Sequence, residues 1–112
     1  MQQVDIGKEF YHRLANRDEK QGDGKYTAVE FREKFLKKFD NKKTWEESTE
    51  TITLDFSNVT KIGPSFANEV FAYFTKYAKP EKILKMIILR NISKVKLSII
   101  QEELETGYKR LT

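Results

Sequence analysis

The sequence contains no cysteine and only one histidine, His12, among its 112 residues. Without cysteine the chain can form no disulfide, no thiolate metal site and no cysteine nucleophile, which suits a reducing cytoplasm. A single histidine with no companion at ligand or catalytic spacing also removes most zinc sites and catalytic triads. We therefore expect no metal, no cofactor and no catalytic residue, and the chain is predicted not to be an enzyme.

Long hydrophobic runs are absent as well. No apolar stretch is long enough to span a membrane, and the first five residues lack the charged and apolar regions of a signal peptide. With 38% hydrophobic residues, a chain of this length can build one small core but no large enclosed chamber. The sequence thus predicts a single domain over residues 1–112, in the cytoplasm and not attached to a membrane.

Charge is plentiful but unevenly placed. The chain has 21 Lys or Arg residues against 17 Asp or Glu, and the bases concentrate at 25–43 and 61–96, on either side of an acidic stretch at 44–60. Many of the lysines fall where a helix needs a solvated face or a favourable charge at its carboxyl end. If so, these lysines form a solvated, mildly basic surface and need no further function. The alternative is a small nucleic-acid-binding protein, which would use Lys34, Lys37, Lys38, Lys76, Lys79, Lys82 and Lys85.

Three segments have the apolar spacing of helices. Thr27 and Glu30 form a capping-box pattern in front of a helix predicted over 28–39. A second helix is predicted over 65–78, because proline suits a first turn and Ser65 is a preferred cap. A third is predicted from the caps Asn91 and Ser93 to near Gly107.

The remaining patterns predict strands and a loop. Apolar residues alternate or run together over 2–11, 51–56 and 83–89, whereas 15–25 is polar and contains Gly22 and Gly24. Strands that alternate with helices at this spacing are typical of parallel neighbours joined by crossovers. The predicted fold class is α/β, with a compact mixed sheet of about four strands or fewer and helices packed against it. Trp45, in a polar segment, has no role in this pattern.

One segment joins the clearest strand to the second helix. It begins with Leu54-Asp55-Phe56-Ser57 and ends with Gly63-Pro64-Ser65-Phe66. This segment resembles the STAS domains typified by anti-sigma factor antagonists. It is more similar to a small STAS-like branch of unknown function, in which Ser-Phe begins the helix and Glu and Phe follow, here Ser65, Phe66, Glu69 and Phe71. Arg17, the glycine-containing loop and Phe31-Arg32-Glu33 extend the resemblance over nearly the whole chain.

Two positions depart from the pattern. Gly63-Pro64 stands where antagonists have small polar or acidic residues, and Thr27-Ala28-Val29 stands where the branch tends to have Ser-Gly-Glu.

The resemblance implies a compact STAS fold and a regulatory protein-protein interaction. The partner would be a histidine-kinase-like ATPase of the anti-sigma type, and Ser65 would be the phosphorylation candidate, because a helix amino end stabilises phosphate. The implied partner-binding residues surround that helix start: Asp55, Ser57, Gly63, Pro64, Ser65, Asn68 and Glu69.

Each of these residues also has a purely structural interpretation. In that interpretation, Ser65 caps its helix and has no further role, and Asp55 accepts hydrogen bonds from loop N–H groups and has no further role. In the same interpretation, Asn68 and Glu69 lie on the rim beside Ser65 and do no more than complement the helix dipole. Arg17 and Arg32 are predicted either to bind an anion near Ser65 or to form intramolecular salt bridges that fix the loop, and the salt bridge is the favoured use.

Overall fold

A computed structural model describes residues 2–18 and 25–109 of the chain. Three strands form a parallel sheet in the order β1 (Gln2–Asp5), β3 (Ile52–Asp55) and β5 (Ile87–Arg90). Two shorter strands, β2 (Arg13–Leu14) and β4 (Lys61–Ile62), pair in parallel as a separate ribbon. The predicted α/β class is confirmed, and all of the strand pairings among the described residues are parallel.

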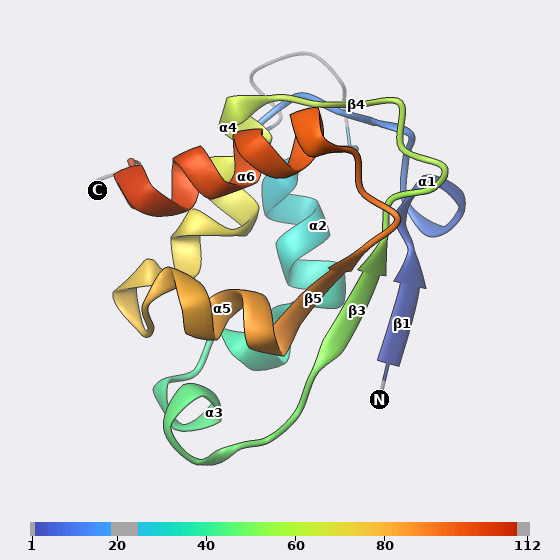
Figure 1. Cartoon of the computed structure of the whole chain (residues 1–112). Helices are drawn as coiled ribbons and strands as arrows, with labels where there is room; N and C mark the ends of the chain where they lie inside the picture. The colour runs from blue at the N-terminus through green and yellow to red at the C-terminus, as the bar shows by residue number, and fades with distance from the viewer. Residues whose placement is uncertain (1, 19–24, 110–112) are drawn as a thin grey trace.

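The helices are α1 (Ile6–Glu9), α2 (Ala28–Phe35), α3 (Lys42–Glu47), α4 (Pro64–Val70), α5 (Pro80–Met86) and α6 (Lys94–Thr106), with short 3-10 turns η2 (Lys37–Phe39) and η3 (Ala72–Lys76). In Figure 1, α2 to α6 lie to one side of the three strands, whereas the short α1 lies on the other side, next to β1. Ile52 and Leu54 of the central strand are fully buried, as are Ile83, Phe66 and Phe74 of the helical layer. Burial of this apolar surface is the main source of the stability of the fold.

The predicted helices are present, but two of them are divided. Residues 28–39 form α2 and then η2, and residues 65–78 form α4 and then η3. The third, α6, begins after its cap Ser93, whose hydroxyl accepts the N–H of Lys96 at 3.3 Å, and it ends before Gly107 at φ 87°. Its long periodic stripe explains why this helix was the most completely predicted.

Two of the predicted strands are too long. The strand predicted over 2–11 ends at Asp5, because the Asp5 carboxylate accepts the N–H of Lys8 and starts the helical turn α1. The strand predicted over 83–89 was wrong at its start, since Pro80 opens α5 and the strand begins only at Ile87. Proline has the backbone angle of a first helical turn and needs no N–H partner there.

Trp45 lies on α3, a helix that the sequence pattern did not reveal. Its side chain is 1% exposed and its indole N–H donates to the backbone carbonyl of Phe39 at 2.6 Å. The ring packs between Phe39 and Phe74, with centroids 5.7 and 5.5 Å away. The isolated tryptophan therefore anchors an otherwise polar segment to the core.

The predicted loop at 15–25 is irregular over the residues that can be described there, and Gly22 and Gly24 lie outside the described residues. In the described part of the chain, no helix is long and apolar enough to cross a membrane.

Candidate functional site

The start of α4 is the centre of the predicted site. Gly63, in an extended conformation, is the N-cap residue, Pro64 occupies the first helical position and Ser65 the second. The prediction that Ser65 caps the helix was therefore wrong, because the Gly-Pro pair starts the helix earlier. Pro64 is exposed and Ser65 is half-buried. Gly63 donates its N–H to the carbonyl of Leu14 at 2.8 Å, which ties the helix start to β2.

Asn68 and Glu69 are buried, with exposed fractions of 0% and 1%. The sequence placed them on an open rim beside Ser65, and this placement was wrong. They follow Ser65 by three and four residues and share its side of the helix, but other segments of the chain cover them. These covering segments come from far away in the sequence.

Glu69 is the centre of a charged network. Its Oε1 lies 2.9 Å from Arg17 Nη1 and its Oε2 lies 2.8 Å from Arg32 Nη2, and the hydroxyl of Tyr108 donates to Oε2 at 2.9 Å. Burial on its own would raise the pKa of Glu69. The hydrogen bonds from Arg32, Tyr108 and Arg17 outweigh it and hold the pKa below its usual value of 4.5. The favoured prediction for the two arginines, an intramolecular salt bridge, is confirmed.

Asn68 uses both ends of its amide. Its oxygen accepts from Arg17 Nη2 at 3.2 Å and from the backbone N–H of Lys109 at 2.9 Å. Its nitrogen donates to Glu103 at 3.1 Å and to the carbonyl of Gly107 at 2.9 Å. The pair Asn68–Glu69 thus joins α4 to α2, to α6 and to the segments at Arg17 and at 107–109.

A tyrosine cluster adjoins this network. Arg32 stacks over the ring of Tyr73 at 3.7 Å, and the hydroxyls of Tyr73 and Tyr77 donate to Asp40 at 2.8 and 2.6 Å. The hydrogen bond to Asp40 raises the pKa of Tyr77 to about 12. Tyr77 therefore remains a protonated donor at neutral pH.

Asp55 and Ser57 lie at the carboxyl end of β3. Asp55 Oδ1 accepts the hydroxyl of Ser57 at 2.7 Å, the N–H of Ser57 at 2.9 Å and the amide of Asn91 at 3.1 Å. These hydrogen bonds, that of the Ser57 hydroxyl most of all, lower the pKa of Asp55. The structural interpretation of Asp55, acceptance of loop hydrogen bonds, is confirmed.

The loop that begins at Ser57 is also fixed from β1. The amide of Asn58 donates to both carboxylate oxygens of Asp5, at 3.2 and 2.9 Å. The backbone of Asn58 approaches Gly7 so closely that a β-carbon there would lie 2.1 Å from the Asn58 carbonyl oxygen. Glycine is therefore required at position 7 for a steric reason.

The predicted partner-binding residues fall into three groups rather than one surface. Asp55 and Ser57 precede β4, whereas Gly63, Pro64 and Ser65 follow it, so that this strand separates the two groups (Figure 1). Asn68 and Glu69 form the third group, below the surface. Glu103 and Tyr108, which complete the buried network, were not predicted, since a glutamate and a tyrosine at a helix end carry no motif.

All seven lysines of the nucleic-acid alternative are exposed. Several of them nevertheless make intramolecular contacts: Lys38 pairs with Glu50 at 2.9 Å, Lys76 lies 3.5 Å from the centre of the Tyr73 ring, and Lys82 donates to the carbonyl of Trp45. Lys38, Lys76 and Lys82 thus make contacts within the chain.

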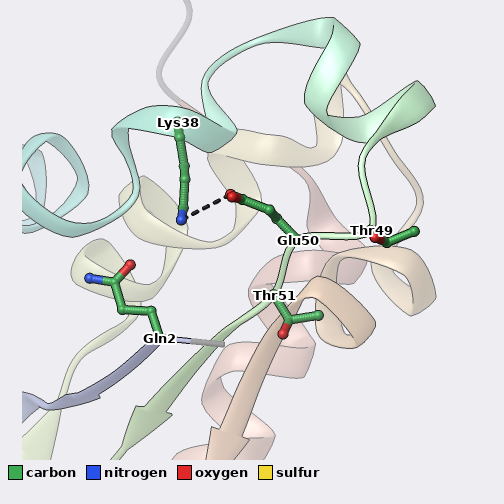
Figure 2. A pocket seen from close by; sticks show the side chains of 5 residues that line it. All are labelled: Gln2, Lys38, Thr49, Glu50 and Thr51. Atoms are coloured by element: carbon green, nitrogen blue, oxygen red, sulfur yellow. Dashed lines mark ion pairs between the residues drawn. The ribbon is translucent and has the colours of Figure 1, made fainter.

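A hollow of about 700 Å³ lies at the amino ends of β1 and β3, away from the predicted site. Figure 2 shows its lining residues Gln2, Lys38, Thr49, Glu50 and Thr51, with the Lys38–Glu50 ion pair beside it. Its charged groups neutralise each other. In the described part of the chain, no three histidine, aspartate or glutamate side chains are grouped so that they could hold a metal ion.

The parallel α/β arrangement and the Asp55-to-Ser65 connection define a domain of the STAS-like class. Residues 27–96 match the family described as a STAS-like domain of unknown function (DUF4325), and the chain belongs to this family. The matched range contains Arg32, Asp55, Ser65 and Glu69, whereas Arg17 and Tyr108 lie outside it. No curated protein and no solved structure matches the chain.

Proposed function

We propose that this protein is a regulatory protein-protein interaction module that docks on its partner through the exposed start of α4. Membership of a STAS-like family points to a regulatory or protein-interaction role. The proposal rests on the exposure and the hydrogen bonding of Ser65. Its side chain is half-buried at the second helical position, makes no capping hydrogen bond, and has no other hydrogen bond within the described residues. Its hydroxyl is therefore available for recognition.

The surroundings of Ser65 favour binding because they are already ordered. Gly63 is hydrogen-bonded to β2, and Asn68 and Glu69 fix α4 from below. A surface that is held in place before binding loses little conformational entropy when a partner docks. Asp55 and Ser57 would lie at the margin of the interface, across β4.

A histidine-kinase-like ATPase of the anti-sigma type is the partner we propose, with Ser65 as its phosphorylation target. A phosphate adds about −1.5 to −2 charges at neutral pH and is favoured near a helix amino end. Arg17 and Arg32 are engaged with Glu69. A phosphate on Ser65 would consequently change the charge of the docking surface without being neutralised by these two arginines, and would weaken the fit of the partner.

The experiment compares the full chain with Ser65→Arg as bait in a native lysate. Ser98→Arg is the matched control, because Ser98 is an exposed serine on α6. We expect wild type and Ser98→Arg to capture the same ATPase and Ser65→Arg to lose it. Mass spectrometry after incubation with ATP and the captured kinase is expected to find phosphate on Ser65. Equal capture by all three baits contradicts the docking surface, and an unmodified Ser65 contradicts the phosphorylation switch alone.

A further inference from the structure

Residues 107–109, here called the strap, fold back onto α4 after the end of α6. The carbonyl of Gly107 accepts from Asn68 at 2.9 Å, the hydroxyl of Tyr108 donates to Glu69 at 2.9 Å, and the N–H of Lys109 donates to Asn68 at 2.9 Å. All three residues of the strap thus bond to the same two neighbouring side chains on α4.

The contacts of the strap are mainly polar. Gly107 and Tyr108 are half-buried and Lys109 is exposed, with its Nζ 3.2 Å from Glu103. The Tyr108 ring meets the edge of Tyr73 at 5.1 Å. A segment with few buried apolar contacts can open locally while the rest of the domain remains folded.

Opening would leave the Glu69 carboxylate paired. Glu69 keeps Arg17 on Oε1 and Arg32 on Oε2 when the bond from Tyr108 is broken. Because an uncompensated buried charge is the main cost of disrupting such networks, release of the strap avoids that cost at Glu69. Glu103 loses its ion pair with Lys109 and keeps the hydrogen bond from Asn68. The network is therefore compatible with two states of the strap.

Together with Arg17, Arg32 of α2 and Glu103 of α6, the strap covers the side of α4 that continues from Ser65. Asn68 and Glu69 lie three and four residues further along, which places them beside Ser65 on one helix face. Their burial, at 0% and 1% exposure, removes a carboxylate and an amide from a surface that otherwise begins at the helix start.

We propose that the strap is an autoinhibitory latch on the α4 docking surface. Closed, it hides Asn68 and Glu69. Released, it adds their hydrogen-bonding groups to the surface at Ser65, and a protein partner with donor side chains binds more tightly. This inference rests on the proposed function, because it concerns regulation of the same docking surface.

The variant Tyr108→Phe tests the latch, since it removes the hydroxyl that binds Glu69 and keeps the ring. Tyr11→Phe is the matched control, a half-buried tyrosine whose hydroxyl has no hydrogen bond within the described part of the chain. Amide hydrogen exchange in the full chain reports strap opening through the N–H of Lys109. We expect exchange about fivefold faster in Tyr108→Phe, the effect of losing one hydrogen bond of typical net strength, and no change in Tyr11→Phe.

Binding of the purified partner captured with wild-type bait is the second readout. Tyr108→Phe is expected to bind it about fivefold more tightly than wild type or Tyr11→Phe, and Ser65→Arg is expected to abolish binding in either background. Unchanged exchange at Lys109 overturns the latch. Binding that depends on Ser65 but ignores Tyr108→Phe also overturns the latch and leaves the docking surface intact. Binding that ignores Ser65→Arg contradicts the docking surface itself, and the latch with it.

Discussion

Replacement of Glu69 by glutamine should destabilise the fold strongly, although the two side chains have nearly the same shape. In the wild type the carboxylate is 1% exposed and balances Arg17 and Arg32, whose side chains are 16% and 10% exposed. Removal of one partner from a buried ion pair costs about 3–5 kcal/mol, because the remaining charge is left uncompensated. We expect about 3 kcal/mol, the lower end of that range, because the glutamine oxygen still accepts a hydrogen bond and Arg17 reaches solvent.

This loss is large compared with the total stability of a small domain, which is about 5–15 kcal/mol. Urea unfolding followed by far-UV circular dichroism measures it as a lower midpoint with an unchanged slope. Glu102→Gln is the control, because Glu102 is an exposed glutamate on α6. If Glu69→Gln is as stable as Glu102→Gln within about 0.5 kcal/mol, the assignment of Glu69 as the centre of a stabilising network is refuted.

Three further predictions concern pH, close packing and the tryptophan. The lowered pKa of Glu69 contributes stability that is present above pH 4.5, the usual pKa of a glutamate, and is lost as the pH falls below that value. Urea midpoints should therefore decline more steeply in that range for wild type than for Glu69→Gln. Parallel curves would contradict this. Gly7→Ala should lower the free energy of unfolding by about 1–3 kcal/mol because the new methyl group clashes with Asn58. Lys8→Ala, at the exposed neighbouring position, should be nearly neutral by the same assay. A Gly7→Ala variant as stable as wild type would disprove the close approach. Trp45→Phe should lower the free energy of unfolding by about 2 kcal/mol, because a hydrogen bond is lost and part of the indole volume is left unfilled. Circular dichroism is the probe, because this variant has no tryptophan left for fluorescence. A loss below about 0.5 kcal/mol would contradict the anchoring role.

The long periodic elements of the fold could be predicted from the sequence. The stripe of α6 and the capping box of Thr27 are local patterns, and local patterns are what periodicity and capping rules describe. The short elements α1 and α3 depend instead on single contacts, such as the Asp5 cap and the burial of Trp45. A single cap or a single buried ring leaves no repeating signal, and the burial of Trp45 is decided by the tertiary structure.

The candidate site was predicted in part for the same reason. Its position at the start of α4 followed from a local motif, and so did the presence of Ser65 in the first turn. The burial of Asn68 and Glu69 did not, because Arg17, Glu103 and Tyr108 reach them from positions 35 to 52 residues away in the chain. The Gly63-Pro64 pair moved the cap away from Ser65, and this is the change that leaves the hydroxyl available.

The most direct test of the proposed docking surface is the affinity of the purified partner for the full chain, measured by isothermal titration calorimetry. Ser65→Glu places a negative charge where phosphate would add one, and Ser98→Glu places the same charge on the exposed face of α6. If the partner docks at the start of α4, Ser65→Glu should bind it about tenfold or more weakly than wild type, equivalent to about 1.4 kcal/mol of binding free energy. Ser98→Glu should bind it with wild-type affinity. Equal affinities for the two variants would contradict docking at the start of α4.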